Sequence, residues 1–312
     1  MIPVTAPNPR SVRALLASPP DARELKAAPM LRAHLRAGDY SAALASLLRA
    51  DGGAGLLGTS SKVERAGGFV GGRDVLTSVV YLAPASVSPG ATLCPYATPG
   101  CLSACLAENT GRMSMPNVAP GRTRKALLFR LFPMHFVAGL QREIRLLARR
   151  AARLGKAPAV RLNGTSDIRW ERFRGALMDT FPGVSFYDYT KAPARSRRLS
   201  SLPENYVLTF SVSERAGSLV EARRYVEAGH GAAVVVAGSL DTKRDAKRAA
   251  ASIITLGSFA GMPTSDGDAH DFRPADAGTL SVLYAKGDAL TDRSGFVHRI
   301  PTTPAARRLQ VV

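Results

Sequence analysis

The feature that most constrains this sequence is the alternation of short apolar segments with helical ones. Runs rich in apolar and β-branched residues recur at residues 74–82, 159–162, 184–187, 206–210, 232–236 and 280–283. Helical patterns lie between several of them, at residues 133–154, 167–180 and 213–228. Strands that alternate with helices are typical of a parallel sheet joined by crossover helices. The sequence therefore predicts an α/β fold, either an open sheet or a partial or complete (β/α) barrel.

The beginning of the chain has a different texture. Residues 1–65 are rich in Ala, Leu and Arg, and the pattern at residues 21–50 predicts two short helices. A glycine-rich stretch at residues 51–58 predicts a linker. We therefore predict a short helical N-terminal extension, residues 1–65, followed by an α/β domain, residues 66–312.

Polar clusters follow four of the predicted strands. They lie at residues 163–167, 188–191, 211–214 and 286–288. The carboxyl ends of parallel strands meet at one edge of the sheet, where α/β proteins place their functional residues. We therefore expect these clusters to share one face.

The three cysteines of the chain, Cys94, Cys101 and Cys105, all fall in the loop after the first predicted strand. Thiolates are soft ligands that suit iron–sulfur clusters and zinc. Three ligands leave one metal position open, as in catalytic sites, although His135 or another distant residue could supply a fourth. The alternative is three small buried apolar side chains. We predict an iron–sulfur cluster or a zinc ion at these cysteines.

A second group of possible ligands comprises Asp266, Asp268, His270 and Asp271. Carboxylates and an imidazole at this spacing could hold Mg²⁺ or Mn²⁺, the ions that nucleases and polymerases use. The alternative is a solvated acidic turn.

The strand end around residue 188 offers candidate catalytic residues. Tyr187 and Tyr189 lie on the same face of a strand, because side chains alternate between faces. A tyrosine at a strand end can act as a covalent nucleophile, with Lys191 to stabilise phosphate charge and Asp167 as a nearby carboxylate. The alternative is that both tyrosines are core or stacking residues.

The charge of the chain points to a polyanionic partner. Lys and Arg number 42 against 24 Asp and Glu, a formal net charge of +18. Such a field favours nucleic acid, whereas a biased genomic composition is the alternative explanation. The candidate phosphate-binding residues follow two strand ends and are Arg122, Arg124, Lys125, Arg195, Arg197 and Arg198.

Other motifs are absent from the sequence. It contains neither a Walker A motif nor the Rossmann glycine fingerprint. Its first residues do not resemble a signal peptide, and no apolar stretch is long enough to span a membrane. An odd number of clustered cysteines argues against a disulfide framework. We therefore expect a cytoplasmic protein without a membrane partner.

Several segments, in this order, resemble the "gene product 88" family of phage proteins over roughly residues 75–297. These segments are CPYATPGCLSAC, RLNGTSDIRWE, FYDYTK, NYVLTFSVSE, DGDAHDFRPAD and LYAKG. The resemblance implies a phage or mobile-element setting but no particular reaction. Family members often have Tyr directly after the third cysteine, where this chain has Leu106. A weaker analogy is to radical SAM enzymes, which carry a three-cysteine loop after the first strand of a partial barrel, with a different spacing.

Three functional hypotheses follow. The first is a protein of DNA replication or processing, in which the acidic group holds a divalent ion for phosphoryl transfer and Tyr187 or Tyr189 is a nucleophile. The second is a radical-type iron–sulfur enzyme that binds S-adenosylmethionine. The third is a non-catalytic accessory protein that binds DNA.

Overall fold

The computed structural model describes residues 3–48, 55–59, 63, 69–109, 115, 118–192 and 195–301. Its centre is a run of seven parallel strands in the spatial order β2-β3-β4-β5-β6-β9-β8. Their bounds are β2 Val75–Val80, β3 Ala157–Arg161, β4 Ser185–Thr190, β5 Tyr206–Ser211, β6 Gly231–Ala237, β9 Leu280–Tyr284 and β8 Met262–Asp266. The predicted α/β class with a mostly parallel sheet is thereby confirmed.

The two ends of the sheet are short antiparallel pairs. β1 (Leu57–Gly58) pairs with β2, and β7 (Ser258–Phe259) pairs with β8. Within the described residues no strand pairing joins these two ends, so the sheet is open and a complete barrel is not confirmed.

All six predicted strands are present, and four further strands were not predicted: the two-residue strands β1 and β7, and also β8 and β10. β8 reads Met-Pro-Thr-Ser-Asp, which lacks the apolar run expected of a buried strand. β10 (Val297–Arg299) has only three residues and pairs with residues 235–237 of β6. β9 pairs with one edge of β6, so β5 and β10 share the other edge. β5 pairs with the beginning of β6, and β10 pairs with its carboxyl end.

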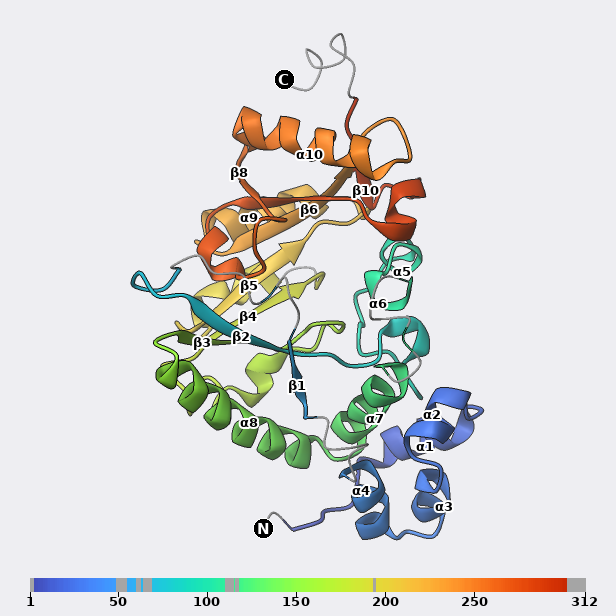
Figure 1. The fold of residues 1–312 in the computed structure, drawn as a ribbon. Helices are drawn as coiled ribbons and strands as arrows, with labels where there is room; N and C mark the ends of the chain where they lie inside the picture. Colours follow the sequence, from blue (N-terminus) through green and yellow to red (C-terminus); the bar gives the residue numbers. More distant parts are fainter. Residues whose placement is uncertain are drawn as a thin grey trace.

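Three crossover helices cover the sheet. α8 (Pro133–Arg153) packs on β2 and β3, α9 (Ser218–Glu227) on β5 and β6, and α10 (Lys243–Leu256) on β6 and β9 (Figure 1). α8 buries an apolar stripe spaced by three and four residues, Phe136, Val137, Leu140, Ile144, Leu147 and Ala151. The predicted helices at residues 133–154 and 213–228 are therefore confirmed, the second with a later start.

The helix predicted at residues 167–180 is wrong. The segment forms a single 3₁₀ turn, Trp170–Phe173, followed by further turns. Within the segment, backbone N–H groups bond carbonyls three to five residues earlier in short turns, such as Arg172 to Arg169 and Asp179 to Arg174. At its start, Asn163 Oδ1 accepts from the backbone N–H of Ile168 and from Nε1 of Trp170.

The N-terminal part is helical, as predicted, with three helices rather than two in residues 21–48. α1 (Pro9–Ala17), α2 (Ala22–Ala27) and α4 (Tyr40–Leu48) contact α7 (Val118–Leu131), and α3 (Leu31–Arg36) packs on α4. Their apolar residues belong to the same core as the sheet. Of the predicted linker, residues 51–54 lie outside the described residues, and the rest includes β1.

None of the helices in the described segments is both long enough and apolar enough to cross a membrane.

Candidate functional site at the carboxyl ends of the strands

A cavity of about 430 Å³ lies at the carboxyl ends of the parallel strands. All four predicted polar clusters contribute to its lining, and so does the cysteine loop. Its polar lining includes Cys94, Cys101, Cys105, Arg161, Asn163, Asp167, Tyr189, Lys191, Ser211, Asp271 and Lys286. The structure thus brings together side chains from opposite ends of the sequence.

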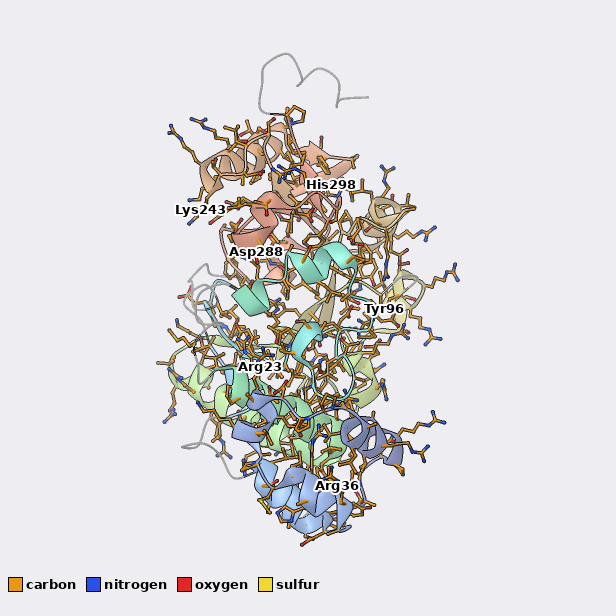
Figure 2. The ribbon with its side chains drawn as sticks, turned by 90° about the vertical axis from the view of Figure 1, so that its right-hand side faces the viewer. Arg23, Arg36, Tyr96, Lys243, Asp288 and His298 are labelled. Atoms are coloured by element: carbon orange, nitrogen blue, oxygen red, sulfur yellow. The ribbon has the colours of Figure 1, made fainter. Side chains whose placement is uncertain are left out.

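The cysteine loop forms one wall of this cavity. Cys101 lies in the short helix α5 (Pro99–Ser103), and Cys105 lies between α5 and α6 (Leu106–Asn109). Figure 2 views the molecule from this side, with α5 and α6 between the N-terminal helices below and α10 above. All three cysteines are free thiols and half-buried.

The loop is attached to the sheet through Glu214, whose position after β5 was predicted but whose role was missed. Its carboxylate accepts hydrogen bonds from the hydroxyl of Thr98 (2.7 Å) and from the backbone N–H of Gly100 (2.8 Å). Thr98 in turn accepts from the backbone N–H of Cys101 at 3.2 Å. The carboxylate therefore holds the start of the cysteine-bearing helix.

Gly100 is packed too tightly to carry a side chain. A Cβ at this position would lie 2.1 Å from the hydroxyl oxygen of Ser294 and 2.6 Å from Cβ of Phe296. The loop can approach the C-terminal part of the chain this closely only because residue 100 is a glycine.

The cysteine sulfurs share a wall without forming a ready-made metal site. Burial raises the pKa of Cys94 to about 12, and the charge of Asp167 adds to this effect, so its thiol is protonated at neutral pH and donates to the carbonyl of Thr165 at 3.5 Å. A metal would have to displace this proton. In the described parts of the chain, no group of three or more His, Cys, Asp or Glu is arranged to hold a metal ion. The iron–sulfur cluster or zinc ion remains a prediction.

A second wall is organised by Asn163, which the sequence analysis placed in a polar cluster without assigning it a role. Besides the donors of Ile168 (3.0 Å) and Trp170 (3.0 Å), Oδ1 accepts from the hydroxyl of Ser166 at 2.8 Å. Nδ2 donates to the carbonyl of Ile168 at 2.9 Å. These four hydrogen bonds of the carboxamide fix the loop that carries Asp167.

Asp167 lines the cavity, as expected of a candidate catalytic residue. Its carboxylate accepts from the hydroxyl of Thr190 and from the backbone N–H of Lys191, both at 2.8 Å. Burial raises its pKa, and these two hydrogen bonds oppose the rise.

The two candidate nucleophiles lie on the same face of β4 but in different surroundings. Tyr187 is fully buried in an apolar cluster, with its ring edge-on to Phe272 at 5.6 Å between centroids. Tyr189 lines the cavity, and the guanidinium of Arg161 lies 4.6 Å from the centre of its ring. Burial raises the pKa of both phenols, which counts against a phenolate nucleophile.

The four predicted ligands of Mg²⁺ or Mn²⁺, three aspartates and a histidine, do not point toward a common centre. Asp266 is exposed, Asp268 pairs with Lys286, and Asp271 pairs with Arg161 at 3.0 Å. The imidazole of His270 lies 3.6 Å from another carboxylate, that of Asp276. Each group has its own partner, so the Mg²⁺ or Mn²⁺ prediction finds no gathered site among the described residues.

Three of the six predicted phosphate-binding residues are buried, and a fourth, Lys125, is half-buried. Arg122 and Arg124 lie inside α7, where Arg124 donates to the carbonyl of Leu47. Lys125 donates to a backbone carbonyl, and burial lowers its pKa to about 8. Arg195 is buried against Glu171 at 2.5 Å. Burial of this kind counts against direct phosphate contacts.

The exposed cations lie elsewhere. Arg197 and Arg198 are exposed, and so is a row of arginines on the outer face of α8: Arg142, Arg145, Arg149, Arg150 and Arg153. Glu143, the acidic residue of this helix, turns inward and accepts from the backbone N–H groups of Leu56 and Leu57.

Comparison with known proteins gives a family but no characterised relative. Neither the curated proteins nor the solved structures include a match to the chain. The family described as gene product 88 matches residues 47–300, a span that includes the sheet, the cysteine loop and the cavity. The chain therefore belongs to the gene product 88 family, as its motifs predicted.

Proposed function

We propose that this protein is an enzyme that binds an iron–sulfur cluster or a zinc ion through Cys94, Cys101 and Cys105 and carries out its reaction in the adjoining cavity. The observation that carries the proposal is that all three cysteines line the same cavity as the polar strand ends. A purely structural metal would have no need of this location, whereas a catalytic one needs room for a substrate beside it.

The residue types fit such a centre. Three thiolates are enough to hold a cluster or a zinc ion with one position left open for a substrate. The protein itself would supply Asp167, Tyr189 and Lys191 around that position, to bind and orient the substrate.

Metal analysis after aerobic and anaerobic purification tests the proposal. We expect iron with sulfide, or zinc, in the wild-type protein, and its loss in Cys94→Ser, Cys101→Ser and Cys105→Ser. Ser103→Ala is the matched control, because this serine lies in the same helix and its hydroxyl donates to the carbonyl of Gly100 within that helix. A wild-type protein with neither metal would refute the proposal.

If iron and sulfide are found, a second assay identifies the class of reaction. Release of 5′-deoxyadenosine from S-adenosylmethionine after reduction would support radical-type chemistry. Absence of this product would leave a cluster with another role.

We propose in addition that the protein binds nucleic acid through the outer face of α8. The observation that favours this is the row of five exposed arginines without an exposed carboxylate. Arginine side chains on one helix face can neutralise successive phosphates, and the net charge of +18 favours the encounter.

Salt-dependent binding of a single-stranded oligonucleotide tests this surface. Replacing the five α8 arginines with Gln should flatten the dependence of log K on log salt, by about 0.7 for each phosphate that the protein no longer neutralises. The control replaces five exposed cations of the N-terminal helices, Arg10, Arg13, Arg23, Lys26 and Arg36, with Gln, for the same change in charge. Equal effects of the two sets would show that only net charge matters.

A further inference from the structure

Three cations line the cavity, and one of them differs from the other two. Arg161 is paired with Asp271, and Lys286 with Asp268. Lys191 forms no ion pair with any carboxylate of the described residues. Its ammonium donates to the hydroxyl of Ser211.

The nearby carboxylate of Asp167 does not take the place of an ion-pair partner. Its oxygens accept from the hydroxyl of Thr190 and from the backbone N–H, not the ammonium, of Lys191. The ammonium also lies 5.0 Å from the centre of the Phe296 ring, on whose face a cation is favoured. Since an ammonium has three donors, Ser211 leaves this one with hydrogen-bonding capacity beside the cavity.

From this we infer that Lys191 and Ser211 form a subsite for the anionic group, carboxylate or phosphate, of a small organic ligand that occupies the cavity. A volume of about 430 Å³ suits one small molecule rather than a stretch of polymer. Ala97, Ala104, Leu106, Val235 and Leu283 give the cavity apolar walls that suit the rest of such a molecule. The inference rests on the proposed function only in taking this cavity as the reaction site.

A pair of alkylating probes tests the subsite on protein stripped of metal. Iodoacetate and iodoacetamide react with thiols in the same way, by attack of the sulfur on the methylene carbon with loss of iodide, and differ in the negative charge. A cation beside the cysteines should favour iodoacetate. We expect its rate relative to iodoacetamide, measured for each cysteine by peptide mass spectrometry, to exceed the ratio for glutathione by about tenfold.

Two variants with the same change in charge show whether Lys191 is responsible. Lys191→Gln should return the ratio to that of glutathione, and Lys286→Gln, which removes a paired cation of the same cavity, should leave it high. Ser211→Ala should lower the ratio in part. A wild-type ratio equal to that of glutathione, or an equal loss in both lysine variants, would overturn the inference.

Competition identifies the anion. Protection from iodoacetate by phenyl phosphate but not by phenylacetate would assign a phosphate ligand, and the reverse result a carboxylate ligand. Protection by neither compound would count against the subsite. Because the labelling uses protein without metal, a failure of the metal analysis and a failure of the subsite are distinguishable.

Discussion

The two walls of the cavity are built in different ways. The strand-end wall consists of the ends of parallel strands, held by hydrogen bonds of the buried Asn163 and Asp188. The cysteine wall consists of two short helices, whose contacts with the rest of the fold include the hydrogen bonds to Glu214 and the close approach at Gly100. The first wall is therefore part of the central sheet and its core, whereas the second is a loop that packs against the sheet. Damage to the first should unfold the protein, and damage to the second should displace the cysteines in a folded protein.

Replacement of Asn163 should have the largest effect on stability. Asn163→Ala leaves the donors of Ser166, Ile168 and Trp170 without their acceptor, and the residue is only 2% exposed. We expect a loss of about 4–5 kcal/mol in the free energy of unfolding, measured by urea denaturation. Ser166→Ala, which removes one of these donors, should cost about 1 kcal/mol. A loss for Asn163→Ala as small as that of the control would contradict the assignment of this wall to the core.

Asp188 should make the same wall sensitive to pH. Burial raises its pKa to about 7, while Tyr206 and the backbone N–H of Asn163 donate to its carboxylate and oppose the rise. The folded state therefore binds a proton that the unfolded state releases near pH 4. Its contribution to stability is complete below that pH and is lost as the pH rises towards 7, by at most about 4 kcal/mol.

Asp188→Asn removes this titration while keeping the shape of the side chain. Denaturation curves at pH 5 and pH 8 should therefore differ less for the variant than for the wild type. An unchanged pH dependence would show that the carboxyl group is not the source.

Replacement of Gly100 should move the cysteine wall. In Gly100→Ala the new methyl group would collide with Ser294 and Phe296, at a cost of about 1–3 kcal/mol. We expect faster reaction of Cys101 with iodoacetamide in a protein that remains folded by circular dichroism. Gly121→Ala is the control, because a Cβ there would meet nothing within 4 Å. Global unfolding of Gly100→Ala would place this wall in the core as well.

Glu214→Gln should have the smallest effect. The amide keeps one acceptor oxygen, so it loses one of the two hydrogen bonds to the loop and about 1 kcal/mol. We expect a rise in Cys101 reactivity smaller than that of Gly100→Ala. Glu227→Gln, an exposed change at the end of α9, should leave the reactivity unchanged.

Most of the sheet could be predicted, because six of its strands are buried runs of apolar residues. β8 and β10 could not, since one is polar and the other is only three residues long. The segment at residues 167–180 was wrongly predicted as a helix because Trp170, Phe173 and Leu177 have helical spacing. The start of the segment is held by Asn163 through Ile168 and Trp170, and spacing carries no information about such a side-chain partner.

The residues of the site could be predicted from the sequence, but their hydrogen bonds and packing contacts could not. The cysteines and the strand ends are visible in the sequence, and parallel topology brings them together. The role of Glu214 depends on a contact with Gly100 across 114 positions of sequence. The burial of Arg122 and Arg124 depends on helices packing against α7, so charge counts alone did not separate structural arginines from exposed ones.

The close approach at Gly100 also matters for the order in which the site forms during synthesis of the chain. The ribosome makes the cysteine loop well before Glu214, Ser294 and Phe296, the residues against which it rests. During synthesis the three thiols are therefore made before these three residues, which pack against their loop. Any agent that loads or oxidises them meets a more open site in the nascent chain than in the finished protein.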